Sequence, residues 1–449
     1  MNRRHFLGVC AAGFVAGRAR SVPADRAPEC LADQMKQLCR DYIAGFGSPA
    51  TQVCYHHRLN GPRGLAALEK PEQIANGLVN GQSKPFGYGS GIQDVPLENG
   101  QFLYALCDAY EATRDEELAK MACWIFTGLK RVAALSPEPG FVPRGPHPNG
   151  KSYYPDSSRD QHCAYIEALW RYRRCPLATA EDKAFIAGML GRIAGRMERN
   201  DWVLKVEDNS RQAHVGFTWK QFTLFGACSL MGCLAAVKEA DGGRNWSELY
   251  EQLGREKDNL RWKLLSADTP EKCRPFTLYS NQFFTTLALI GRAEGDSTRA
   301  AAVRALMRTM AKRALLTNVF DETCWRRLDW AGESVTPEIE KALASFGLSV
   351  RKPATVSDLF AKFDPRQLET GDRFVPAINE KLLFGIPTVA FHKALLSEDT
   401  ALVGRVASHV RRMVRLMLDH GGHYDRGENF NRAVILGLHL LALEMRHSP

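Results

Sequence analysis

The residues best suited to chemistry lie close together, between Gly140 and His162. Glycines and prolines stiffen the first half of this stretch, and an apolar helical pattern follows it as far as Leu169. The stretch combines acids, cations and aromatic side chains: Arg144, His147, Lys151, Tyr153, Tyr154, Asp156, Arg159, Asp160 and His162. Because catalytic and binding residues are concentrated on loops that a rigid scaffold positions, we expect this loop to form part of a functional site.

Asp156 and Asp160 are a pair of carboxyl groups four residues apart. Cleavage of a glycosidic bond needs one carboxylic acid to protonate the leaving oxygen and a second carboxylate as base or nucleophile. Asp160 also fits an ordinary acid in the first turn of a helix, where the helix dipole favours it. The second carboxyl group could equally come from another segment; the alternatives are Glu98, Glu380, Asp425 and Glu428.

Helix capping competes with chemistry for some polar residues of these segments. Ser158 to Gln161 fits a capping box, and Thr218 to Gln221 fits the same template. For Gln161 and Gln221 we therefore favour capping over ligand contact.

The cations of the loop suggest an acidic substrate. An arginine such as Arg159 can bind a uronate or sulfate group through a bidentate pair of hydrogen bonds. On a uronic acid polymer, β-elimination would further need a base, for which Tyr154, His162 and His214 are candidates. The alternative is that the arginines pair with the two aspartates and only stiffen the loop.

Polar and aromatic residues suited to sugar binding recur before several other apolar segments. Sugar hydroxyl groups need both donors and acceptors, and the faces of sugar rings stack on aromatic side chains. The candidate substrate-binding residues are Arg159, His162, His147, Tyr154, His214, Trp219, Asn281, Glu380, Asp425 and Trp325.

The elements that must position these residues are helices. Apolar residues recur at spacings of three and four, and strand-like alternation is nearly absent, so we predict an all-α fold. The predicted helices cover approximately residues 28–45, 98–113, 118–132, 159–175, 185–197, 217–239, 245–264, 278–292, 297–315, 378–396, 399–418 and 430–446.

Short and long links alternate between these segments. A short link forces two helices into an antiparallel hairpin, so strict alternation places every long link on one side of the assembly. Twelve helices in this order predict a single (α/α)6 toroid of six hairpins, with long loops on one face, over residues 25–449. The longest link, about 316–377, carries Trp325 and Trp330 and predicts either a cap over that face or a packing insertion.

In this alternation and in the 140–162 loop, the chain resembles the six-hairpin glycosidase-like superfamily over about residues 28–447. The resemblance implies an (α/α)6 carbohydrate-active enzyme. The prediction is a glycoside hydrolase acting on oligo- or polysaccharides, uronic-acid-containing ones among them, by carboxylate acid/base catalysis with Asp160, Asp156 and Glu98. The paired-aspartate signature of members that hydrolyse unsaturated uronyl sugars is not found here. A polysaccharide lyase on a similar toroid and a non-catalytic carbohydrate-binding protein remain alternatives.

The N-terminus resembles a twin-arginine export signal. Arg3 and Arg4 precede a mildly apolar run to Gly17, and a small-x-small cleavage site ends at Ala24. Residues 1–24 are therefore predicted to be removed by the twin-arginine export machinery, which leaves a periplasmic or secreted protein. A lipoprotein signal at Cys10 and a plain basic tail are the alternatives. The apolar run is too short to span a membrane, and we expect no integral membrane segment elsewhere.

Composition excludes several other classes of function. The formal net charge of +9 falls to +5 without the four arginines of residues 1–24, which gives no reason to expect a nucleic acid partner. The twelve cysteines show no metal-ligand spacing. His420 to Asp425 could be a metal cluster, but a loop is favoured, and Gly87 to Gly91 is interpreted as a turn rather than a nucleotide loop. We therefore expect no metal and no cofactor.

Overall fold

The fold of the chain is given by a computed structural model, which describes residues 30–61, 64–68, 78–79, 82–83, 90–213, 215–266, 278–317, 385–423 and 427–447. Within these residues there are twelve α-helices: α1 (Leu31–Phe46), α2 (Val95–Thr113), α3 (Glu116–Leu135), α4 (Arg159–Arg174), α5 (Ala180–Arg199), α6 (Leu224–Ala240), α7 (Trp246–Leu264), α8 (Leu278–Ala293), α9 (Ser297–Thr317), α15 (Gly385–Leu396), α16 (Thr400–His420) and α17 (Gly427–His447). The prediction of an all-α fold is confirmed. None of the described helices is long and apolar enough to cross a membrane.

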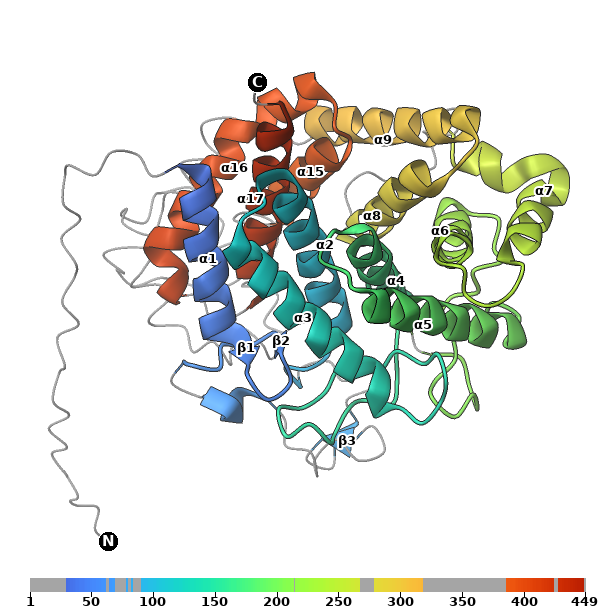
Figure 1. Cartoon of the computed structure of the whole chain (residues 1–449), viewed down its shortest axis with the longest axis horizontal. Coiled ribbons are helices and arrows are strands. Elements are labelled where there is room, and N and C mark those ends of the chain that lie inside the picture. Colours follow the sequence, from blue (N-terminus) through green and yellow to red (C-terminus); the bar gives the residue numbers. More distant parts are fainter. Residues whose placement is uncertain are drawn as a thin grey trace, which may run out of the picture. The chain divides into compact units, whose positions relative to one another are not determined.

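Six of these helices form a closed inner ring. Each of α2, α4, α6, α8, α15 and α17 packs against the next in this order, and α17 packs back against α2. The other six lie outside them: α3, α5, α7, α9 and α16 each follow an inner helix, while the first helix, α1, covers the last, α17 (Figure 1). This alternation of inner and outer helices confirms the predicted (α/α)6 toroid.

The inner helices approach one another closely. A Cβ atom on Gly100 of α2 would lie 2.6 Å from the carbonyl oxygen of Ala164 on α4. Such a distance is far below an ordinary contact, so only glycine lets the two backbones come together here. The contact fixes the spacing between the starts of α2 and α4.

One predicted helix begins later than the sequence pattern suggests. The pattern placed its start near residue 217, but α6 begins at Leu224, and the Thr223 side chain accepts a hydrogen bond from the Gly226 amide. The capping box expected at Thr218 to Gln221 is therefore wrong. Trp219 lies in the core of the link instead, and its backbone amide donates to the Trp202 carbonyl at 2.8 Å.

Two very short hairpins decorate the link between α1 and α2. Strand β1 (Gly47–Ser48) pairs with β2 (Val53–Cys54), and β3 (Leu78–Val79) pairs with β4 (Gln82–Ser83), both antiparallel. The Asn99 side chain of α2 fixes β2 by accepting from the Cys54 amide at 2.7 Å and donating to its carbonyl at 2.8 Å. The histidines that follow β2 are thereby held beside α2.

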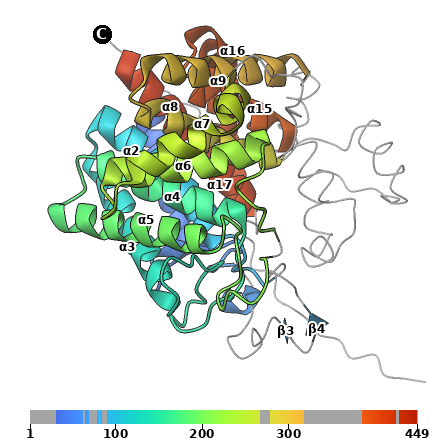
Figure 2. The same ribbon diagram turned by 90° about the vertical axis from the view of Figure 1, so that its right-hand side faces the viewer.

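The described long links meet at one end of the ring. The Val95 amide, which starts α2, donates to the carbonyl of Arg144, and the Arg159 amide, which starts α4, donates to that of Val215. The Gly427 amide at the start of α17 donates to the His56 carbonyl. Figure 2 views the helices from the side. We call this end, where the inner helices begin, the open face.

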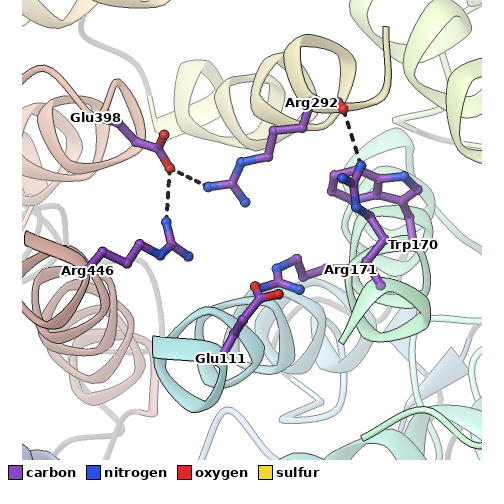
Figure 3. Close-up of a pocket in the computed structure, with 7 residues that line it drawn as sticks. Glu111, Trp170, Arg171, Arg292, Glu398 and Arg446 are labelled. Atoms are coloured by element: carbon purple, nitrogen blue, oxygen red, sulfur yellow. Dashed lines mark hydrogen bonds and ion pairs between the residues drawn. The ribbon is translucent and has the colours of Figure 1, made fainter. Parts of the chain in front are cut away.

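The opposite end of the ring is lined by charged side chains at the C-terminal ends of the inner helices. They surround a cavity of about 330 Å³ lined by Glu111, Trp170, Arg171, Arg174, Arg292, Glu398 and Arg446 (Figure 3). Arg292 and Arg446 both donate to Glu398, at 2.5 and 3.3 Å. Buried Asp108 of α2 accepts a hydrogen bond at 2.7 Å from Arg171, one of the residues that line this cavity. Cations at helix C-termini offset the partial negative charge of the helix ends.

Candidate functional site

The candidate site is built around the first turn of α2, on the open face. Asp94 occupies the N-cap position of this helix, but its side chain makes no capping hydrogen bond. Gln161 of α4 takes over that role, because its Oε1 accepts from the Leu97 amide at 3.1 Å. The Nε2 of Gln161 then donates to Oδ1 of Asp94 at 2.7 Å. The Asp94 carboxyl is thus released from capping and held by a neighbouring helix.

This arrangement corrects the expected capping box at Ser158. Ser158 is the N-cap of α4, but its side chain does not cap the helix. Gln161 caps α2 rather than its own helix because the Gly100 contact brings the starts of α2 and α4 together.

The Asp94 carboxyl lies among several charged groups. Arg144, which is fully buried, donates to its Oδ1 at 3.3 Å, and one fifth of the Asp94 side chain remains exposed. Burial raises the pKa of Asp94 to about 7; Arg144 and His56 oppose this rise, while the negative charges of Asp160 and Glu98 add to it. At neutral pH the Asp94 carboxyl therefore carries a proton for a large part of the time.

Glu98, one turn further along α2, is a second buried carboxyl group. Its Oε1 lies 3.1 Å from Nδ1 of His56, and its side chain is 8% exposed. Its Oε2 is buried and has no hydrogen-bond partner among the residues that the structure describes. Glu98 therefore has one oxygen fixed by an imidazole and a second, buried oxygen without a hydrogen bond among the described residues.

The loop before α4 supplies the wall of this site. The guanidinium of Arg144 donates to the Gln93 carbonyl at 3.1 Å as well as to Asp94, which fixes the turn that leads into α2. His57 packs edge-on against His56, with 5.5 Å between ring centroids. The loop from 140 to 158 and the histidines after β2 thus enclose the start of α2 from two sides.

The two aspartates singled out in the sequence have different surroundings. Asp160 lies close enough to Asp94 for its charge to raise the pKa of that group. Asp156 is buried and makes two contacts within the open face: its Oδ1 accepts from the Ser157 amide at 2.7 Å, and its Oδ2 pairs with Arg211 at 2.9 Å. These contacts tie the link before α4 to the link before α6.

His162 points into the protein. Burial, with the nearby positive charge of Arg196, lowers its pKa to about 3, so the ring is neutral. Ser157 donates its hydroxyl proton to the Val142 carbonyl at 2.6 Å and so accepts from Nδ1 of His162 at 3.0 Å. This chain of hydrogen bonds assigns the proton of the imidazole to Nδ1.

The other candidate binding residues of the described segments lie at different depths. Tyr154 and Trp219 are almost fully buried among apolar side chains. His147 is partly exposed, and its Nδ1 accepts from the Asn149 amide in the tip of the loop. Arg159 is nearly buried and lies over the rings of Phe217 and Phe225. Of these four, Arg159 and His147 retain exposed surface.

The remaining candidates fall outside what the structure describes. His214, Trp325, Glu380 and Asp425 lie outside the described residues, as do the proposed cap at 316–377 beyond α9 and residues 1–24. Asn281 lies in α8, but its side chain is not described. Their roles stay predictions.

Sequence reasoning missed Asp94 and His56. The signal for Asp94 was present, because an aspartate directly before Val95-Pro96 marks a helix start. Nothing in the sequence, however, indicated that Gln161 would take over its capping role. His56 and His57 stand in a segment without helical periodicity, 42 residues before Glu98 in the case of His56. Tertiary contacts bring these segments together, among them those of Asn99 with β2 and the hydrogen bond from the His56 amide to the Gly91 carbonyl.

Comparison with known proteins found a similar solved structure but no matching family. No family model matches the sequence, and no curated protein matches it. A solved structure, the cellobiose 2-epimerase from Spirochaeta thermophila DSM 6192, is similar in structure at 12% sequence identity, with a TM-score of 0.38, over 77% of this chain and 86% of that chain. The chemistry of the open face is therefore argued from the residues of this chain alone.

Proposed function

We propose that the chain is a carbohydrate-active enzyme that hydrolyses glycosidic bonds of oligo- or polysaccharides at the open face. The observation that carries this proposal is the Asp94 carboxyl, whose pKa is raised to about 7 next to other carboxyl groups. Acid/base pairs are recognised by environments that push the pKa values of neighbouring groups apart. Glycoside hydrolysis is the reaction class that uses two such carboxyl groups most directly.

In this proposal Asp94 is the general acid and a neighbouring carboxylate, Glu98 or Asp160, is the base. Asp94 gives its proton to the glycosidic oxygen as the bond between that oxygen and the anomeric carbon breaks. The carboxylate removes a proton from a water molecule, whose oxygen forms the new bond to the anomeric carbon. The Oε2 of Glu98, which makes no hydrogen bond among the described residues, favours Glu98 in this second role. Asp156 then acts by positioning the loop through Ser157 and Arg211.

A second candidate is proton exchange next to a sugar carbonyl, which would epimerise the sugar. The observation that favours it is His56, an imidazole held by Glu98 beside the protonated Asp94. An imidazole removes a proton from one face of a carbon centre, and a protonated carboxyl group returns one. This reaction breaks no glycosidic bond, so its products differ from those of hydrolysis.

The test is a screen of the full-length protein against neutral and acidic oligosaccharides in heavy water. Hydrolysis releases reducing ends, whereas elimination gives a product that absorbs ultraviolet light, and epimerisation introduces deuterium next to the carbonyl without cleavage. We expect release of reducing ends from at least one substrate. Deuterium exchange alone would replace the first candidate by the second, and absorbance would favour a lyase. Binding without turnover would indicate a carbohydrate-binding protein.

Export remains part of the proposal. Arg3, Arg4 and the segment up to Ala24 support passage by the twin-arginine route to the periplasm or beyond. The N-terminal sequence of the protein recovered from its native cells tests this point, and we expect it to begin at Asp25. A chain that begins at Met1 would contradict removal of the signal.

A further inference from the structure

Arg159 stands where a cation is least favoured. It is the first residue of α4, and the positive end of a helix dipole repels a positive side chain. Its exposure is only 8%, so water screens the charge poorly. A second, negative group is needed to make this position favourable.

Among the described residues, no carboxylate pairs with the Arg159 side chain, although Asp160 follows it in the chain. Other buried arginines of these segments each have a carboxylate: Arg144 pairs with Asp94 at 3.3 Å, and Arg171 with Asp108 at 2.7 Å. Arg261 likewise pairs with Glu256 at 2.5 Å. Arg159 alone in this comparison makes neither a hydrogen bond nor an ion pair through its side chain within the described part of the chain.

Two aromatic rings hold the guanidinium of Arg159 instead. Its central carbon lies 4.5 Å from the ring centroid of Phe225 and 5.4 Å from that of Phe217. Phe225 is in turn fixed against Phe283, with 4.5 Å between their centroids. The N–H donors lie in the plane of a guanidinium, so contacts with ring faces leave them available to a planar, two-oxygen partner.

Phe217 adds a surface for a sugar ring. It is 46% exposed, which is unusual for a large apolar side chain in the described residues. The faces of pyranose rings pack against aromatic rings through their C–H groups, so an exposed ring beside a buried cation suits a sugar that carries an acid. Arg159 also directly precedes Asp160, whose charge reaches Asp94.

We infer that Arg159, the α4 N-terminus and Phe217 form a subsite for the carboxylate of a uronic acid unit, so that the substrate is an acidic rather than a neutral saccharide. This inference rests on the proposed function and specifies its substrate class. The planar fork of arginine matches a carboxylate with two parallel hydrogen bonds, and the helix N-terminus adds to the attraction.

The experiment measures binding of uronic acid oligosaccharides and of the same oligosaccharides with each carboxyl group reduced to an alcohol. Calorimetric titration of the full-length protein is expected to show binding at least about 10-fold tighter for the acidic form, the gain expected for a charge-assisted hydrogen-bonded pair. In Arg159→Met this preference is expected to disappear, while affinity for the reduced form stays within about 3-fold of wild type. Phe217→Ala is expected to weaken both forms by about 3- to 10-fold, as for loss of one aromatic contact.

Lys220→Met is the matched control. Lys220 lies in the same link, pairs with exposed Asp201, and its removal takes away the same charge without touching Arg159. We expect it to retain the preference for the acidic form. A structural arginine would, in addition, lower the melting temperature when removed, whereas Arg159→Met is expected to leave it unchanged or raise it.

The possible failures are distinct. If wild type binds the reduced form as tightly as the acidic form, the subsite assignment is overturned while a carbohydrate-active function stands. Equal loss of preference in Lys220→Met would also overturn it, since general charge would then explain the preference. If neither form binds and neither is turned over, the proposed function fails together with the substrate class.

Discussion

At the scale of single residues, the open face depends on Asp94, whose side chain does not cap the helix that it precedes. Asp94 stands at a helix N-cap, where aspartate ordinarily accepts backbone hydrogen bonds and stays ionised. Gln161 supplies the capping oxygen, so Asp94 is left in a poorly solvated place with a pKa of about 7. The chemical role that we propose for Asp94 therefore depends on a glutamine of another helix.

A first prediction concerns Asp94→Asn. The amide keeps the shape of the side chain but cannot donate an acidic proton, so the rate of hydrolysis is expected to fall by about 100-fold or more. In wild type, kcat/KM is expected to decline as pH rises above about 7, because Asp94 loses its proton there. Rates measured from pH 5 to about pH 9 on one cleaved substrate test both points.

Asp208→Asn is the matched control for this substitution. Asp208 is an exposed turn residue, and its Oδ1 accepts from the Ser210 amide. Its substitution is expected to leave the pH profile unchanged. An Asp94→Asn protein with the wild-type rate would exclude Asp94 as the acid.

Asp94→Asn, which is expected to lower activity, is also predicted to raise the stability of the fold. The folded-state pKa of Asp94 is raised from 3.8 to about 7, so the folded protein holds this proton more tightly than the unfolded chain. Stability from Asp94 is therefore complete below its unfolded pKa and declines as pH rises to about 7. Asp94→Asn, which cannot ionise, should raise the melting temperature relative to wild type more at pH 8 than at pH 4. An equal shift at both pH values would argue against a raised pKa.

At the scale of elements, the site depends on how closely α2 and α4 approach. The Gly100 contact with Ala164 puts Gln161 within reach of both Leu97 and Asp94. The sequence predicted the bounds of these helices within a few residues but not the contact between them. A glycine inside an apolar helical pattern does not indicate which helix will pack against it. The helix pattern also predicted too early a start for α6. Trp219 and Phe222 continue the apolar spacing, but the helix begins only after its N-cap residue, Thr223.

Gly100→Ala is predicted to destabilise the protein, contrary to the usual effect of this change in a helix. The new methyl group would lie 2.6 Å from the Ala164 carbonyl oxygen, and overpacking of this kind costs about 1–3 kcal/mol. Gly404→Ala in α16 is the control, because nothing lies within 4 Å of the added atom; it should stabilise by about 0.5–1 kcal/mol. Chemical unfolding of both variants tests the contact. Stabilisation by Gly100→Ala would show that the helices are further apart.

At the scale of the whole molecule, the two ends of the ring are held in different ways. The open face is tied by loops and hydrogen bonds, whereas the opposite end is tied by ion pairs around Asp108. This carboxylate of α2 meets Arg171 of α4 and Arg292 of α8 at 2.7 and 3.4 Å, and His439 of α17 at 3.4 Å. The repeated short links predicted the ring, but no periodicity predicted a single acid shared by three other helices.

Asp108→Asn is accordingly predicted to be among the most damaging single changes. Loss of the charge removes from a buried site the carboxylate that Arg171, Arg292 and His439 share, and breaking a buried pair in this way costs about 3–5 kcal/mol. Glu117→Gln, which breaks the exposed pair with Arg40 at 2.7 Å, should cost less than about 1 kcal/mol. Unfolding by urea at pH 7 compares the two. A similar small loss in both would show that Asp108 does not hold the ring together.

The charge of Asp108 also predicts sensitivity to acid. Burial by itself would raise the pKa of this carboxyl, but Arg292, Arg171 and His439 hold it well below its usual range. Its contribution is complete above the unfolded pKa and is lost as pH falls through the lower folded value. Wild type should therefore lose stability below about pH 4 more steeply than Asp108→Asn does. Parallel slopes for the two proteins between pH 4 and about pH 2 would contradict this role.

The central claim is that the open face cleaves glycosidic bonds with Asp94 as the acid. Release of reducing ends by wild type and Asp94→Asn, measured side by side over the oligosaccharide panel, tests it most directly. The account predicts release by wild type from at least one substrate and a loss of about 100-fold or more in the variant. No release from any substrate, or equal release by both proteins, would contradict it.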